Sequence, residues 1–161
     1  MTCCSKPGTS LVDMRLDDVL RPVTKALTAH FNIATATGRH MMRQGSGAIL
    51  AMAGGREAIP RLGGSHVAWA ALAGLCRQLA AEFGPHGVRV SWLLSPGSPD
   101  HEQRDEASVG EESPAPGTHG LLLRHQPTYA EVANVATFAA SDWARTMTAT
   151  EINFTRGAVI D

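Results

Sequence analysis

The chain has 161 residues, a length that suits one domain or a piece of a larger one. Hydrophobic residues make up 43% and charged residues 18%, so the chain can build a packed core. Fourteen Lys and Arg residues against fifteen Asp and Glu residues leave a formal charge of -1, which argues against a general nucleic-acid binder. No apolar run reaches the roughly 18 residues of a membrane-spanning helix.

Neither a leader sequence nor a disulfide framework is visible. The first residues, MTCCSKPGTS, lack the apolar stretch of a signal peptide. Three cysteines do not make a disulfide framework, and Cys76 falls in an apolar segment, where we expect an inert core thiol. We therefore expect a cytoplasmic protein that partners neither nucleic acid nor a membrane.

The N-terminal part of the chain is expected to be a tail followed by a helix. Residues 1–12 are predicted to form a flexible tail, and residues 13–161 one domain. Helical spacing extends from Leu16 to about Met42 and places three apolar residues on one face: Leu27, Phe31 and Ala34. Pro22 is expected in the first turn of a helix, where its missing N–H costs little.

The next segments predict two strands joined by a helix. Residues 47–53 (GAILAMA) are continuous and apolar between glycines, which is typical of a strand buried on both faces of a parallel sheet. Residues 66–83 are rich in alanine, the best helix former, and Gly84-Pro85 ends that helix. Residues 88–94 (VRVSWLL) form a second buried strand. This order predicts a βαβ unit with a right-handed crossover.

Residues 95–127 break the pattern. Six acidic residues and a single arginine lie between Asp100 and Glu112, and prolines and glycines follow them. Such a stretch is either a mobile lid over a site or a disordered segment, and we place an acidic lid at about 98–127. Its histidines are irregularly spaced, so no metal site is predicted from them: His101, His119 and His125.

Order is expected to return near Pro127. Thr128 and Glu131 have the spacing of a capping box, which predicts the start of a helix. That helix is expected to end near Ser141 and Asp142. Residues 151–154 then predict a third strand, with residues 158–160 as its tail.

Three stretches of the sequence form one combined pattern through their order and spacing: GAILAMAGG, then SHVAWAALAGLCRQLAAEFGPHGVRVSWLLSPG, then PTYAEVANVATFAASDWARTMTATEINFTRGAVID. In this order and spacing they resemble the C-terminal portion of the short-chain dehydrogenase/reductase family, in particular ketoacyl-carrier-protein reductases. The resemblance covers residues 13–161. It implies an α/β fold, the C-terminal half of a Rossmann-like doubly wound parallel sheet with about three strands remaining.

The cofactor half of the family pattern is not found in the sequence. Family members open with a Gly-x-x-x-Gly-x-Gly turn, which lets backbone N–H groups approach the cofactor pyrophosphate. None of the sixteen glycines here has that spacing. Pro96 and Gly97 match the family turn that contacts the nicotinamide end, and they would equally serve to end a strand. NAD(P)H is therefore implied by the resemblance only, and no cofactor is expected for the isolated chain.

The catalytic positions of the family carry other residues in this sequence. The tyrosine position falls on Ser65, the lysine position on Trp69 and the serine position near Ala53 or on Gly54. In the family the tyrosine is the general acid/base, the lysine lowers its pKa and binds the nicotinamide ribose, and the serine orients the substrate oxygen. The chain has a single tyrosine, Tyr129, and no lysine after Lys25, so a shifted motif cannot restore the pair. No catalytic residue is assigned.

Two residues at or beside these positions, His66 and Trp69, need a separate interpretation. His66 is titratable, but one residue along a helix rotates a side chain by about 100°, so it is expected to point away from the tyrosine position. Trp69 is expected to be either a core residue or an interface anchor, because aromatic residues are favoured at interfaces.

The predicted half-sheet leaves one strand exposed. The far side of residues 47–53 lacks a predicted neighbour, and an apolar, unpaired edge invites pairing with another chain. In the family, the helices that correspond to residues 22–43 and 65–83 form a four-helix dimer interface. The resemblance therefore implies a homo-oligomer, or a hetero-oligomer with a full-length homologue.

Three functions remain open at this point. The first is a reductase-like protein that is catalytically incompetent as an isolated chain, a truncated pseudo-enzyme or interaction subunit. The second is an NAD(P)H-dependent oxidoreductase acting on a carbonyl or hydroxyl group, whose cofactor half is missing from these residues. The third is a small-ligand binding module that uses the old substrate cleft.

Overall fold

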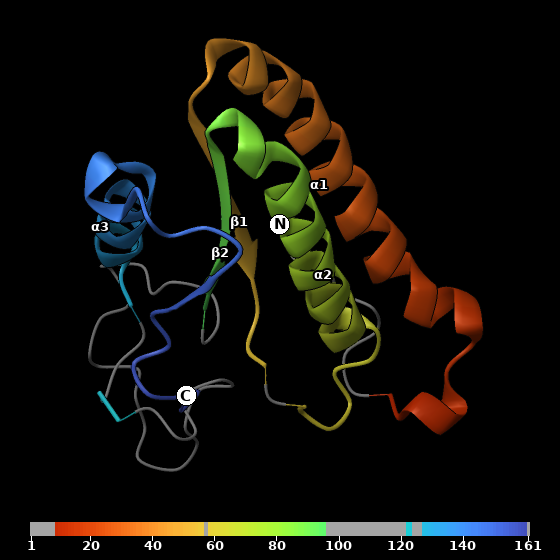
Figure 1. Cartoon of the computed structure of the whole chain (residues 1–161). Helices are drawn as coiled ribbons and strands as arrows, with labels where there is room; N and C mark the ends of the chain where they lie inside the picture. Colours follow the sequence, from red (N-terminus) through yellow and green to blue (C-terminus); the bar gives the residue numbers. More distant parts are fainter. Residues whose placement is uncertain (1–8, 57, 96–121, 124–126, 161) are drawn as a thin grey trace.

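A computed structural model describes residues 9–56, 58–95, 122–123 and 127–160, and every structural statement below concerns these residues. Three parallel strands form one sheet in the order β1 (Gly47–Ala53), β2 (Val88–Leu94) and β3 (Glu151–Asn153). The two longest helices, α1 (Leu16–Gln44) and α2 (Ser65–Phe83), pack side by side, and α3 (Tyr129–Ala140) lies apart from them across the sheet (Figure 1). The predicted α/β class with about three strands is confirmed.

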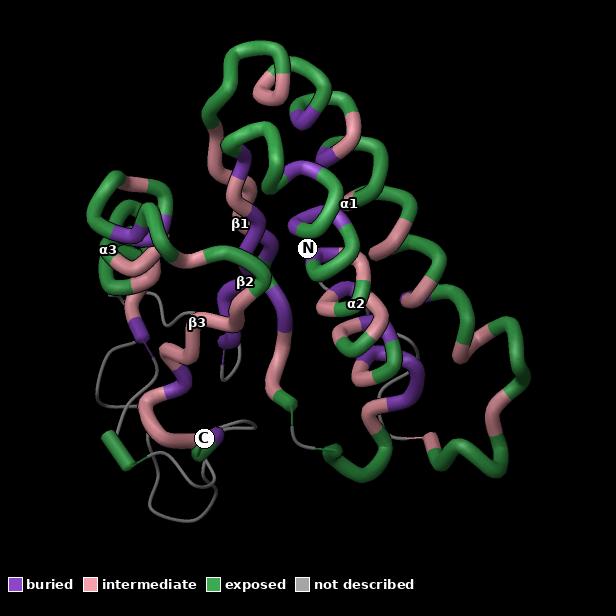
Figure 2. Tube along the Cα trace, viewed as in Figure 1, coloured by how far each residue is buried: buried purple, intermediate pink, exposed green. Residues whose placement is uncertain are grey.

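The core lies between α2 and the two long strands. β1 and β2 pair residue for residue from Gly47–Val88 to Ala53–Leu94. Every β2 residue except Arg89 is buried, as a central parallel strand requires, and Figure 2 shows this buried stretch of the tube. Leu72, Cys76 and Leu79 of α2 pack on it and are at most 5% exposed. The predicted βαβ unit is therefore the structural centre of the molecule.

Helix α1 begins earlier than Pro22, so the prediction of a first-turn proline was wrong. Its first turn instead holds Asp17 and Asp18, whose negative charges stabilise the N-terminal end of a helix. Pro22 is buried inside the helix and cannot donate to the carbonyl of Asp18, four residues earlier. Phe31, predicted to lie on the apolar face, is 51% exposed.

Two glycines let α1 and α2 approach each other closely. A Cβ atom at Gly38 would lie less than 3.0 Å from the ring of Phe83, so the ring packs against bare backbone. A Cβ at Gly64, the residue before α2, would overlap the carbonyl oxygen of Val19 and lie 2.9 Å from the Pro22 ring. The second contact fixes the start of α2, where Ser65 lies.

Helix α3 is held at both ends by named contacts. The predicted capping box is present, because the Thr128 hydroxyl accepts a bond from the Glu131 N–H (3.2 Å) and the Glu131 carboxylate accepts one from the Thr128 N–H (2.7 Å). At the other end, the guanidinium of Arg89 on β2 donates to the carbonyls of Ala139 (2.9 Å) and Ala140 (3.1 Å). Arg89 therefore ties α3 to the sheet.

The remaining segments are short. β3 ends at Asn153, and residues 158–160 are not part of a strand, contrary to the predicted tail; the Val159 N–H donates to the Thr155 hydroxyl (3.0 Å). A 3-10 turn, η1 (Leu11–Asp13), includes the last two residues of the predicted tail, residues 1–12. Within the described ranges, no helix combines the length and the apolar character needed to cross a bilayer.

Candidate functional site

Of the three positions at which the family resemblance implies catalytic residues, Gly54 and Trp69 are in contact beside the end of β1. Gly54 directly follows β1, Ser65 is the first residue of α2, and Trp69 lies one helical turn further on. Ser65 is buried at 9% exposure, and Trp69 is half-buried. Residues at i and i+4 share a face of a helix, so Ser65 and Trp69 face the same side of α2.

The space above Gly54 is filled by the indole of Trp69. A Cβ atom built on Gly54 would lie less than 3.0 Å from three atoms of that ring, Cε2, Cζ2 and Cδ2. Real Cβ atoms essentially never approach so closely, so a side chain at position 54 would require the indole to move. Gly54 and Trp69 are thus matched in shape: the residue without a side chain sits beneath the largest one.

His66 also packs against this indole. Its ring meets the Trp69 ring edge to face, with centroids 6.4 Å apart and an interplanar angle of 82°. The His66 Nδ1 atom is buried and has no hydrogen-bond partner among the described residues. The histidine therefore packs against Trp69.

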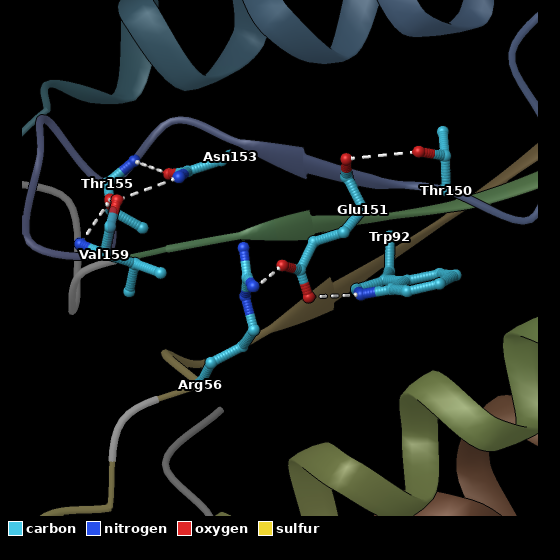
Figure 3. A network of polar contacts seen from close by, with 7 residues as sticks. All are labelled: Arg56, Trp92, Thr150, Glu151, Asn153, Thr155 and Val159. Atoms are coloured by element: carbon cyan, nitrogen blue, oxygen red, sulfur yellow. Dashed lines mark hydrogen bonds and ion pairs between the residues drawn. The ribbon is translucent and has the colours of Figure 1, made fainter. Parts of the chain in front are cut away.

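A polar network fixes the loop that follows Gly54 (Figure 3). The Nε of Arg56 lies 2.7 Å from one carboxylate oxygen of Glu151 on β3, and the indole N–H of Trp92 on β2 donates to the other at 2.8 Å. The guanidinium of Arg77 on α2 lies 4.7 Å from the centre of the Trp92 ring. The Glu151 carboxylate thus binds both Arg56 and Trp92, and these contacts link the loop after β1 to β2 and β3.

Sequence reasoning missed this network, because its members are far apart in the chain. Trp92 and Glu151 are 59 residues apart and meet only because β2 and β3 pair in register at these two residues. The charged residue types alone gave no signal that they would meet.

Several predicted residues fall outside the described part of the chain. Pro96 and Gly97 do so, as do three histidines and most of the predicted lid at 98–127. Of that lid, Leu122, Leu123 and Pro127 are described, and the N–H groups of the two leucines donate to the carbonyl of Arg156 at 2.9 and 3.1 Å.

A hollow lies between α3 and the segment after β3. It has a volume of about 620 Å³ and is bounded in part by Leu122, Val135 and Val159. Glu131 and Arg156 form an ion pair at this hollow. The Thr128 N–H and the Arg156 guanidinium, both bonded to the Glu131 carboxylate, lower its pKa.

Neither a reactive thiol nor a metal-binding cluster is found among the described residues. Burial raises the pKa of the Cys76 thiol to about 11, so at neutral pH the thiol is protonated and a weak nucleophile. No group of three His, Cys, Asp or Glu side chains within the described ranges is placed to hold a metal ion.

A family model matches most of the chain, and two curated proteins match parts of it. A family model described as Enoyl-(Acyl carrier protein) reductase matches residues 3–158. The chain is 38% identical over 95 residues to Protein FixR of Bradyrhizobium diazoefficiens, covering 55% of this chain and 30% of that protein. It is 47% identical over 64 residues to Short-chain reductase protein NovJ of Streptomyces niveus, covering 38% of this chain and 24% of that protein.

Solved structures share the fold. The carveol dehydrogenase of Mycobacterium avium, solved in complex with NAD, superposes with a TM-score of 0.79 at 23% identity, over 94% of this chain and 60% of its own. At this level of identity the likeness concerns the fold alone. The matched sequence thus covers less than a third of the length of each of these two curated relatives. It covers about three fifths of the length of the carveol dehydrogenase.

Proposed function

We propose that this chain, which belongs to the short-chain dehydrogenase/reductase family, is a catalytically incompetent member that acts by interaction rather than by hydride transfer. The observation that carries the proposal is the contact between Gly54 and Trp69. Both residues stand at positions where the family resemblance implies catalytic side chains, and the indole of one fills the space above the other.

The residue types at the three positions do not support the family's proton transfer. Proton transfer to a carbonyl needs a donor whose pKa lies near the working pH. The hydroxyl of Ser65 is a weak acid that serves this role only with an activating base. The indole of Trp69 carries no positive charge, so it cannot lower a neighbouring pKa as an ammonium group does.

The geometry closes the site as well as changing its chemistry. A substrate oxygen held by a serine at position 54 would need the volume that the Trp69 ring takes. Restoring a serine there would require the indole to shift, and His66 also packs against that indole, edge to face. The replacements therefore support each other, as a repacked core does.

These residues do not fit NAD(P)H. The 161 residues hold no Gly-x-x-x-Gly-x-Gly turn for the pyrophosphate. At the nicotinamide end, the position from which a lysine would bind the ribose carries Trp69, whose ring faces Gly54. No reaction step is therefore assigned to the cofactor in this chain.

The test is a titration of the purified chain with NADH and NADPH, followed by nicotinamide fluorescence. We expect no binding at millimolar cofactor. Binding tighter than about 100 μM, which corresponds to roughly -5.5 kcal/mol, would contradict the proposal. The variant W69K is the matched comparison, because it returns the positive charge implied by the resemblance while leaving Gly54 and Ser65 unchanged.

An interaction role is supported by exposed apolar side chains on the two long helices. Phe31 and Ile33 on α1 are 51% and 66% exposed, and Val67 on α2 is 48% exposed. These helices are the expected interface at residues 22–43 and 65–83. Light scattering tests this part: a homo-oligomer or a complex with a full-length homologue is expected, and a monodisperse 17.0 kDa monomer that does not bind such a homologue would contradict it.

One observation supports each of two other candidate functions. The carveol dehydrogenase holds NAD, so an oxidoreductase whose cofactor half lies outside these residues is the second candidate. The hollow of about 620 Å³ beside α3 supports a third candidate, a module that binds a small ligand. A thermal shift with acyl or aromatic compounds would separate the third from the first, because a ligand that binds only the folded chain raises its melting temperature.

A further inference from the structure

The hollow beside α3 is separate from the positions that the family resemblance singles out. Gly54, Ser65 and Trp69 are not among its described lining residues. Its volume of about 620 Å³ lies within the range of about 300–1,000 Å³ that is typical of small-molecule sites. Such sites are mostly apolar and hold a few placed polar groups. The hollow has this composition, because its lining includes four aliphatic side chains beside one ion pair: Leu122, Leu123, Val135 and Val159.

The wall that follows β3 is held by its own hydrogen bonds (Figure 3). The Val159 N–H donates to the Thr155 hydroxyl (3.0 Å), and the side-chain amide of Asn153 donates to the Val159 carbonyl (3.0 Å). Thr155 itself is fully buried. A wall that is fixed before a ligand arrives loses little conformational freedom on binding, so this side of the hollow is ready for an occupant.

The backbone at Arg156 is held in a conformation that residues other than glycine rarely adopt. Its φ angle of +55° lies in the left-handed region. Its carbonyl accepts the N–H bonds of Leu122 and Leu123, and the Leu122 side chain packs on the bare backbone of Gly157. Strained residues of this kind cluster at functional sites. Here the strained residue is the one that brings a positive charge to the hollow.

The guanidinium of Arg156 has donors to spare. Its side chain lines the hollow and is only 12% exposed, so water has little access to it. A guanidinium carries five N–H donors. Within the described part of the chain, this side chain bonds only to Glu131, through Nη2. Donors that are removed from water without a partner are costly, and an acceptor atom on a ligand would remove that cost.

The ion pair determines which acceptor fits. The Glu131 carboxylate balances the charge of Arg156, while its other oxygen accepts the Thr128 N–H at 2.7 Å. A carboxylate on a ligand would bring a second negative charge beside Glu131 and would lose its hydration without a net positive charge in return. A carbonyl oxygen accepts the same N–H bonds without adding charge. The hollow therefore favours an uncharged acceptor.

We infer that this hollow binds an uncharged, apolar ligand whose carbonyl oxygen, as in an ester, accepts hydrogen bonds from the Arg156 guanidinium. The apolar part of the ligand covers Leu122 and Leu123, which are 70% and 60% exposed in the empty hollow. The inference gives the third candidate function a defined site and ligand class. It goes beyond the interaction role, because the exposed residues that support that role lie on α1 and α2 and not at this hollow.

The experiment is an NMR titration of the intact chain with methyl hexanoate. It follows the methyl resonances of the four aliphatic residues of the hollow, with Leu72 and Leu79 of the buried core as internal controls. The matched probe is hexanoate, which keeps the apolar chain and replaces the ester with a carboxylate. We expect the ester to shift the four residues with a Kd of about 1–10 mM and to leave the two controls unchanged. Hexanoate should bind at least about fivefold more weakly.

Two substitutions test the roles of the ion pair. E131Q keeps a side chain that can cap α3 but removes the negative charge, so Arg156 becomes an unbalanced cation. Hexanoate should then bind about tenfold more tightly than to the unchanged chain, while ester binding should change less than about twofold. R156M removes the donors and should weaken ester binding about tenfold. E82Q removes a carboxylate on α2, away from the hollow, and should alter neither affinity.

Each other outcome overturns the inference. No shift of the four residues at about 20 mM ester, or shifts of the core controls instead, would mean that the hollow is not the site. Equal binding of ester and hexanoate, or the same preference in E131Q as in the unchanged chain, would refute the ligand class. Ester binding that survives in R156M would show that Arg156 is not the donor; if R156M does not fold, the reversal expected in E131Q decides. The cofactor titration stays a separate readout, because nicotinamide binding with normal ester binding would refute the proposed function and leave this site standing.

Discussion

Adding one methyl group at Gly54 should destabilise the chain through Trp69. The new Cβ would lie less than 3.0 Å from three ring atoms, an overlap severe enough for the upper end of overpacking costs, about 3 kcal/mol. The φ angle of Gly54 is not in the left-handed region, so alanine also lowers the entropy of the unfolded chain. This effect stabilises the folded chain by about 0.4–1 kcal/mol. G54A should therefore cost about 2 kcal/mol.

A double-mutant cycle with W69A, measured by chemical denaturation, separates the contact from other effects. Without the indole the methyl group has room, so G54A should stabilise the W69A chain by about 0.4–1 kcal/mol. In the wild-type background the melting temperature should fall by about 4–8 °C. Gly74 provides the control, because a Cβ there meets nothing within 4 Å and G74A should stabilise the helix. An equal effect of G54A in both backgrounds would refute the reasoning.

Three further predictions concern contacts away from this site. R89A should cost about 1.5–3 kcal/mol in a denaturant titration, because it removes charge-assisted bonds to the last carbonyls of α3, and R89K should recover only part. In a chain carrying C3S and C4S, Cys76 should stay unlabelled by a thiol reagent until the chain unfolds, since its pKa is about 11; rapid native labelling would contradict its burial. The lowered pKa of Glu131 stabilises the folded chain above the unfolded value near 4.5, and this stability is lost as the pH falls; E131Q should lose that part of the acid dependence.

Local signals in the sequence predicted the elements well. The capping box of Thr128 and Glu131 acts within one turn, so its spacing is sufficient to place the start of α3. The strand at residues 47–53 is an apolar run bounded by glycines, and its bounds agree with the structure. The prediction for Pro22 was wrong because the preference of proline for a first turn is statistical. Two aspartates upstream of Pro22 stabilise an earlier N-terminal end of the helix.

Packing between distant segments was beyond such reasoning. The family resemblance placed Gly54, Ser65 and Trp69 in the site, but it gave no reason for the indole to lie on Gly54 rather than in the core. The spacing of α1 put Phe31 on an apolar face, yet burial depends on what covers that face, and Phe31 is half exposed. Glu151 finds Trp92 only through strand register, which no local pattern encodes.

The claim that the Trp69 indole fills the space of a side chain at position 54 is tested most directly by NMR of the folded chain. One α-proton of Gly54 occupies the direction of the missing Cβ and should lie against the ring. We predict an upfield ring-current shift of that proton and a nuclear Overhauser contact to the Trp69 ring, both lost in W69A. Ordinary glycine shifts that W69A leaves unchanged, with no such contact, would mean that the site is open and that the account is wrong.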